Sequence, residues 1–90
     1  MKPRQQLDLM NKIIRELEDL KNSQTSVLKK IAQIEADNIN LNEEALSDAL
    51  PEIHERVDDS IQKVSDLIDK CQASRNTFEQ DHQSELVEPT

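Results

Sequence analysis

The spacing of the apolar residues constrains this chain more than any other feature. From Met10 onward they recur at steps of three and four, the repeat of one face of an amphipathic helix. If Met10 is position a of a heptad written abcdefg, the a and d positions up to Leu41 are apolar except for Gln24 and Asn38. This pattern predicts one long helix with a seam of coiled-coil type.

A second frame of the same kind follows, with a positions from Leu50 to Phe78. The two frames are out of phase by two residues, and the slip falls close to Pro51. Proline is disfavoured inside a helix but favoured at its first position. We therefore expect a corner within about 46–50, with a single kinked rod through Pro51 as the alternative.

The predicted fold is all-α, an antiparallel two-helix coiled-coil hairpin that completes a helical bundle by oligomerisation. The polar run 21–26 leaves a further break in the first helix as an alternative. The expected organisation is a single domain, 1–90, made of a helix over about 5–45, a corner over about 46–50, a helix over about 51–82 and a tail over 83–90.

A corner near residue 49 would pair positions whose numbers sum to about 98. It would place Asn38 opposite Ser60 and Gln24 opposite Ser74, so that each amide meets a hydroxyl and neither is buried unpaired. Both polar series repeat every fourteen residues. The match therefore fixes the register only together with the position of the corner.

The e positions carry a third apolar stripe. A two-stranded coiled coil needs only its a and d positions, whereas apolar a, d and e positions together are typical of helices that face a bundle. We expect this edge to be a protein interface; the alternative is that scattered exposed aliphatic residues have no role. The expected interface residues are Leu7, Ile14, Leu28, Ile61 and Ile68.

The net charge of −8 lies in the second part of the chain, because residues 1–35 carry +2 and residues 36–90 carry −10. This balance argues against direct binding of nucleic acid, which needs clustered Lys and Arg. The acidic outer face of the second helix is either a solvated surface or a docking site for a basic partner. Its residues are Glu52, Glu55, Asp58, Asp59, Asp66 and Asp69.

The residues that could take part in a reaction do not form a catalytic pattern. Cys71 falls at an a position, where a buried and unreactive thiol is the common case. His54 and His82 have no metal-ligand spacing, and the chain has no glycine for a phosphate-binding loop. We expect no enzyme activity, no cofactor, no metal and no small-molecule ligand.

Composition sets the remaining expectations. Hydrophobic residues make up 34% of the chain and charged residues 33%, which leaves disorder as an alternative to a helical fold. The periodicity of the apolar residues favours the helices. The absence of a long apolar run or a secretory signal, together with a single cysteine, predicts an intracellular, cytoplasmic protein without a membrane partner.

These features predict a non-enzymatic protein–protein interaction or assembly module. Its partners would be protein helices, in a homo-oligomer or a larger heteromeric complex. The alternative function is that of a small acidic inhibitor, chaperone or nucleic-acid mimic that binds a basic protein. Raised salt would weaken such acidic docking but not the burial of an apolar edge.

Overall fold

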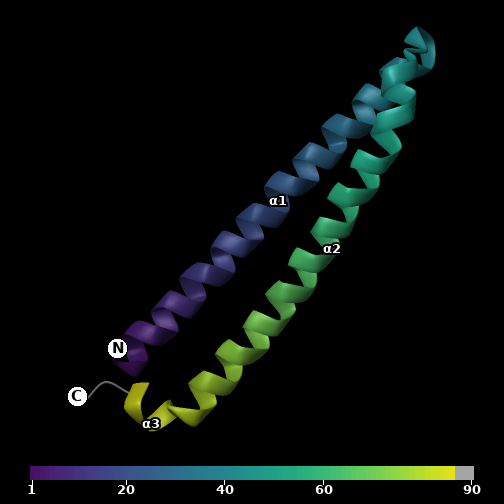
Figure 1. The fold of residues 1–90 in the computed structure, drawn as a ribbon. Helices are drawn as coiled ribbons and strands as arrows, with labels where there is room; N and C mark the ends of the chain where they lie inside the picture. The colour runs from purple at the N-terminus through teal and green to yellow at the C-terminus, as the bar shows by residue number, and fades with distance from the viewer. Residues whose placement is uncertain (87–90) are drawn as a thin grey trace.

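The computed structural model describes residues 1–86 and shows two long antiparallel helices (Figure 1). Helix α1 spans Pro3–Leu41, and helix α2 spans Glu44–Asp81. A short helix, α3, spans Gln83–Leu86 and lies at the open end of the hairpin, beside the start of α1. The predicted all-α hairpin is confirmed, and residues 87–90 of the expected tail lie outside the described residues.

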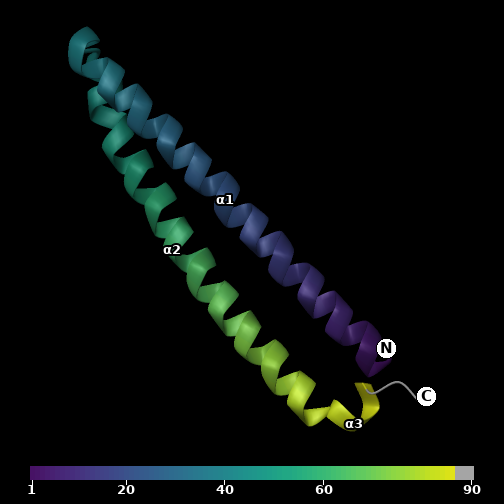
Figure 2. The ribbon, with the colours of Figure 1, turned by 180° about the vertical axis from the view of Figure 1, so that it is seen from behind.

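The hairpin is a thin rod. Its principal extents are 68 × 18 × 17 Å, and α1 and α2 lie side by side along most of its length in both views (Figures 1 and 2). No strand occurs among residues 1–86. A rod of this width has a single line of contact between its helices, so each helix can bury only one narrow stripe in it.

The start of α1 is stabilised by residues that favour the first turn of a helix. Pro3 stands at the first helical position, where its missing N–H costs nothing. The backbone N–H of Lys2 donates a hydrogen bond of 3.2 Å to Oε1 of Gln5, which satisfies one donor at the helix start. From there α1 runs for 39 residues without a break, so the alternative of an interruption within 21–26 is not realised.

The reversal lies at Asn42 and Glu43, which corrects the expected corner at 46–50. Asn42 takes the left-handed conformation, with φ 57° and ψ 45°, and its N–H donates to the carbonyl of Asn38 at 2.6 Å. Asparagine is, after glycine, the residue that most readily ends a helix in this way. A two-residue turn that contains no glycine therefore takes up the phase slip between the two frames.

Pro51 lies inside α2 rather than at its start, so the expected beginning of the second helix at this residue was wrong. The side chain is exposed and lines a hollow beside the turn. Without an N–H, Pro51 cannot donate to the carbonyl four residues earlier, which belongs to Ser47. Packing of the following turns against α1 sustains the helix through this missing bond.

The earlier turn also corrects the register. Gln24 Nε2 donates to Ser60 Oγ at 2.7 Å, and Lys21 Nζ donates to Ser65 Oγ at 3.1 Å. The numbers of these pairs add to 84 and 86 instead of about 98. Gln24 thus meets a serine as expected, but the serine lies fourteen residues before Ser74, because the polar series repeats at that interval.

Candidate interaction surface

The contact between α1 and α2, here called the seam, is formed by the a and e positions of both helices. From Leu7 on α1 and from Leu50 on α2, all of these side chains are buried or half-buried. On α1 they are Leu7, Met10, Ile14, Leu17, Lys21, Gln24, Leu28, Ile31, Glu35 and Asn38. On α2 they are Leu50, His54, Val57, Ile61, Val64, Ile68, Cys71, Arg75 and Phe78.

The five residues expected to form an exposed interface therefore lie in the seam. Leu7, Ile14, Ile61 and Ile68 are each only 7–8% exposed, and Leu28 is half-buried. The other helix of the same chain already covers them, so they do not form an uncovered edge. The a and e positions alternate at steps of four and three just as a and d do, and spacing alone does not separate the two seams.

The long polar residues of the seam show how e positions enter it. The Nδ1 atom of His54 lies 2.6 Å from Oε1 of Glu35, which joins the two helices near the turn. Farther along, Arg75 donates to Oδ1 of Asn11 at 3.2 Å, on the opposite helix. Such side chains bury their stems in the contact while their polar ends reach partners at its margin. Their charge does not exclude them from the seam.

A continuous apolar surface remains outside the seam, at the d positions, and we call it the strip. On α1 the five d positions from Ile13 to Leu41 are aliphatic and exposed, from 36% at Ile34 to 69% at Leu41. On α2, Ile53 and Leu67 are each 45% exposed, and Leu46 is half-buried. The strip consists of Ile13, Leu20, Val27, Ile34, Leu41, Leu46, Ile53 and Leu67, with Ser60 and Ser74 in the same repeat on α2.

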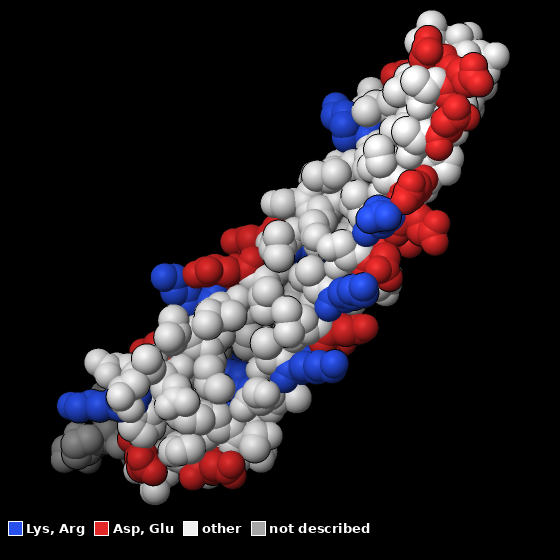
Figure 3. Space-filling view, viewed as in Figure 1, with Lys and Arg blue, Asp and Glu red and all other residues white. Residues whose placement is uncertain are grey.

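The strip of α1 and the strip of α2 form one surface. Because the helices run antiparallel, their d positions flank the seam on the same side. The observed register places Leu20 across from Leu67, and Ile34 across from Ile53. Figure 3 shows a face with uncharged side chains along its middle and with Lys, Arg, Asp and Glu mostly toward its margins.

The other side of the seam is polar along most of its length, with one exposed apolar residue, Ile39, close to the turn. Its b positions include Asn11, Thr25, Ser65 and Gln72, and the hydrogen bonds that Lys21 and Arg75 make to the opposite helix end there. Away from the turn, the hairpin therefore has one apolar side and one polar side. This asymmetry makes the strip a specific surface rather than a scatter of exposed aliphatic residues.

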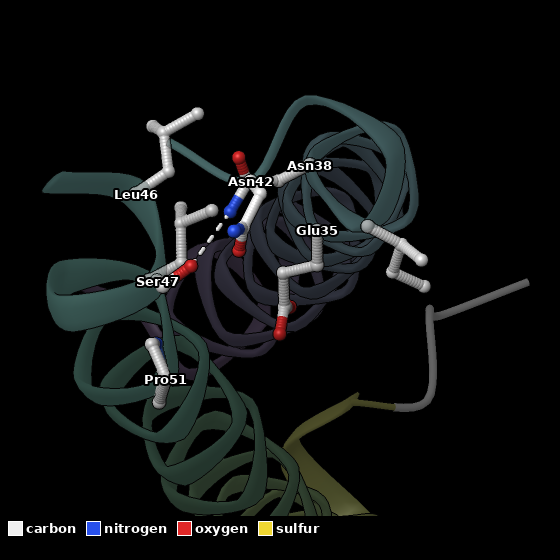
Figure 4. A pocket seen from close by; sticks show the side chains of 8 residues that line it. Glu35, Asn38, Asn42, Leu46, Ser47 and Pro51 are labelled. Carbon is white, nitrogen blue, oxygen red and sulfur yellow. Dashed lines mark hydrogen bonds between the residues drawn. The ribbon is translucent and has the colours of Figure 1, made fainter. Parts of the chain in front are cut away.

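The turn holds a further cluster, which the sequence did not reveal. Oδ1 of Asn38 accepts from the N–H of Glu43 at 2.8 Å, and Nδ2 donates to Ser47 Oγ at 2.9 Å and to the Glu43 carbonyl at 3.3 Å. Figure 4 shows Asn38 directed at Ser47 across the turn. Asn38 is 8% exposed, so its amide replaces water for the first backbone groups of α2.

A hollow of about 300 Å³ lies beside this cluster. It is lined by Glu35, Asn38, Ile39, Asn42, Leu46, Ser47, Leu50 and Pro51. The amide of Asn38 is already bonded within the turn, so the hollow offers a ligand few free polar groups at its base.

The sequence signal for the turn was Asn42, because asparagine tolerates the left-handed conformation in a chain that has no glycine.

The six acidic residues singled out on α2 are all exposed. Two of them pair with bases one turn later in the same helix, Glu52 with Arg56 at 2.9 Å and Asp59 with Lys63 at 3.0 Å. The other four carboxylates make no ion pair within residues 1–86: Glu55, Asp58, Asp66 and Asp69. The face is thus partly neutralised, and its free charges lie on a single helix.

The cysteine and the second histidine, which were candidates for chemistry, both pack within the hairpin. Cys71 is half-buried in the seam, and His82 stacks on Phe78 with ring centroids 4.1 Å apart. Within residues 1–86, no three His, Cys, Asp or Glu side chains come together in a way that could hold a metal ion. None of the described helices combines the length and the apolar character needed to cross a membrane.

A scan of protein-family models gives no match to this chain, and searches of curated proteins and of solved structures give none either. The function is therefore argued from the surface of the hairpin.

Proposed function

We propose that this chain is a protein–protein interaction module whose strip packs against helices of another polypeptide. The observation that supports the proposal most is the difference between the strip and the seam on α1. All five strip positions of α1 are aliphatic, whereas the seam includes Lys21, Gln24, Glu35 and Asn38. A stripe this regular is typical of a helix that is covered on that side.

The free energy available from covering the strip is large for a chain of this size. Seven of its aliphatic side chains keep between 36% and 69% of their surface exposed. Full burial of one such side chain is worth roughly 1.5–3 kcal/mol, so covering what remains is worth roughly 5–10 kcal/mol before the entropic cost of association. Packing of partner helices with a matching apolar stripe against the strip would release this free energy.

A photo-crosslinking side chain tests the proposal in the cells that make the protein. Benzoylphenylalanine in place of Val27 would stand in the middle of the strip, and the same group in place of Ala32 would stand on the polar side of the same helix. We expect a discrete protein adduct from position 27 and none from position 32. No adduct at position 27, or the same adducts at both positions, would contradict the proposal.

A second candidate function is docking of a basic protein on the acidic face of α2. The four carboxylates without an ion pair favour it: Glu55, Asp58, Asp66 and Asp69. Such a complex would weaken steeply as salt is raised, because exposed charges are screened within about 8–10 Å at physiological ionic strength. A complex held by the strip would persist, so a salt titration of any isolated complex separates the two functions.

A further inference from the structure

We infer that the partner of the strip is a second copy of this chain, in a four-helix bundle whose two turns lie at the same end. The inference rests on the proposed function and names its partner. Each α1 would pack on α2 of the other copy, and a two-fold axis would run along the rod. Every helix would then have two antiparallel neighbours, one from its own chain and one from the other.

The size of the strip matches what a stable dimer needs. From Ile13 to Leu41 it spans 28 residue steps, or about 42 Å at 1.5 Å per residue. The hairpin is 17–18 Å wide. One face of this length therefore offers about 750 Å², close to the roughly 800 Å² per partner of a standard interface. A second hairpin of the same length covers the strip from end to end.

The distribution of charge selects the arrangement of the two copies. α1 carries six Lys or Arg and six Asp or Glu, for a net charge of zero. α2 carries four Lys or Arg and ten Asp or Glu, for a net charge of −6. With both turns at one end, each acidic α2 packs on a neutral α1. With the turns at opposite ends, α2 would pack on α2, and the two charges of −6 would repel.

The margins of the strip agree with this choice. On α2 the margin is basic, with Arg56, Lys63 and Lys70 each two turns apart on the helix surface. On α1 the corresponding margin carries Glu16 at the level of Lys70, and Lys30 at the level of Arg56. Turns at one end thus give one attractive and one repulsive pair per α1–α2 contact. Turns at opposite ends would set the three bases of one α2 against the same three bases of the other, although Arg56 and Lys63 each also pair with a carboxylate of their own helix.

The mass of the purified chain is the first test. Light scattering should give about twice the 10.4 kDa of one chain. Raising NaCl from about 50 mM to about 500 mM should lower the dimer Kd several-fold, because two chains of charge −8 repel less when screened. A monomer at all concentrations up to about 1 mM, or a dimer that salt dissociates, would overturn the inference.

A matched pair of double variants links the dimer to the strip. Leu20→Gln with Leu67→Gln changes two facing residues of the strip without changing charge, and glutamine is a good helix former. Ala32→Gln with Ala73→Gln places the same residue at two exposed positions outside the strip. The first variant should weaken the dimer at least 100-fold with its helix content retained, and the second should leave the dimer intact. Equal effects of the two variants would overturn the inference.

A distance between spin labels tests the arrangement. With Asp8→Cys labelled in a Cys71→Ser background, one label stands on each chain near the open end of the hairpin. Turns at one end predict a label distance below about 40 Å. Turns at opposite ends, with the strips centred on each other, separate the labels by about 57 Å along the rod. The longer distance would overturn the proposed arrangement.

These results separate the inference from the proposed function. A monomeric purified chain whose position 27 still captures another protein in cells would overturn the second copy as partner and leave the interaction module standing. A monomeric chain with no adduct at position 27 would overturn both.

Discussion

The seam and the strip of α1 differ in composition, and the difference is the reverse of what burial alone would predict. The seam is buried yet contains Lys21, Gln24, Glu35 and Asn38, while the strip is exposed yet holds only aliphatic residues. In the seam, polar side chains form hydrogen bonds between the helices and near the turn, which gives the hairpin its register. The five strip positions of α1 carry no polar group. The seam thus sets the register of the hairpin, and the proposed contact at the strip would supply free energy for association.

The largest expected effect distinguishes the two regions by stability. Ile61→Ala removes a buried side chain from the seam and should lower the free energy of unfolding by about 2–4 kcal/mol at every protein concentration. Leu20→Ala, in the strip, should have an effect that grows with concentration, because the exposed half of this side chain contributes only to association. Urea titrations at two concentrations measure both. A concentration-independent loss of the same size for Leu20→Ala would contradict the distinction.

Asn38→Leu tests whether polar residues of the seam are structural. It removes the acceptor of the Glu43 N–H and the donor to Ser47, and it should destabilise the hairpin by about 1.5–3 kcal/mol. The matched variant is Gln24→Leu, which removes one hydrogen bond and also a buried Oε1 atom that has no partner. We expect its effect to be near zero or stabilising. A stabilising Asn38→Leu would show that the turn does not depend on this amide.

Pro51→Ala should stabilise the hairpin, by about 1–3 kcal/mol. Alanine restores the N–H that the Ser47 carbonyl lacks in α2 and relieves the clash of the proline ring with the preceding turn. Thermal unfolding followed by circular dichroism measures the change. If α2 began at Pro51, where proline is favoured, the same substitution would be neutral or destabilising.

The smallest expected effect concerns Asn42. Replacement by alanine should lower the free energy of unfolding by about 1 kcal/mol, because alanine resists the left-handed conformation, and replacement by glycine should change it by less than about 0.5 kcal/mol. Equilibrium unfolding of the two variants checks the order. An alanine variant as stable as the glycine variant would place the reversal elsewhere.

The helices, the hairpin and the existence of three apolar stripes could be predicted from the sequence, because each follows from the three-and-four spacing of residues such as Ile14, Ile31 and Leu50. The position of the turn could not be predicted so readily. Pro51 is a strong local signal, but its cost is a single missing hydrogen bond that packing outweighs. Asn42 is a weaker signal, and its conformation depends on the bonds that Asn38 makes only after the chain has reversed.

The prediction of which heptad positions form the contact between the helices was wrong for a related reason. The d positions of α1 from Ile13 onward are all aliphatic, so hydrophobicity alone favoured them for the seam over e positions that include Lys21 and Glu35. The seam instead accepts these long side chains because their stems are apolar and their polar ends reach Ser65 and His54 at the margin. Single-helix patterns do not contain this information, since it depends on which residues of the other helix lie opposite.

The most direct test of the account is an isotope-filtered nuclear Overhauser experiment on a mixture of chains with labelled and unlabelled isoleucine methyl groups. Ile13, Ile34 and Ile53 lie in the strip, and Ile14, Ile31, Ile61 and Ile68 lie in the seam. We predict contacts between chains at the strip methyls and contacts only within a chain at the seam methyls. Contacts between chains at Ile14 or Ile61, with none at the strip, would contradict the account.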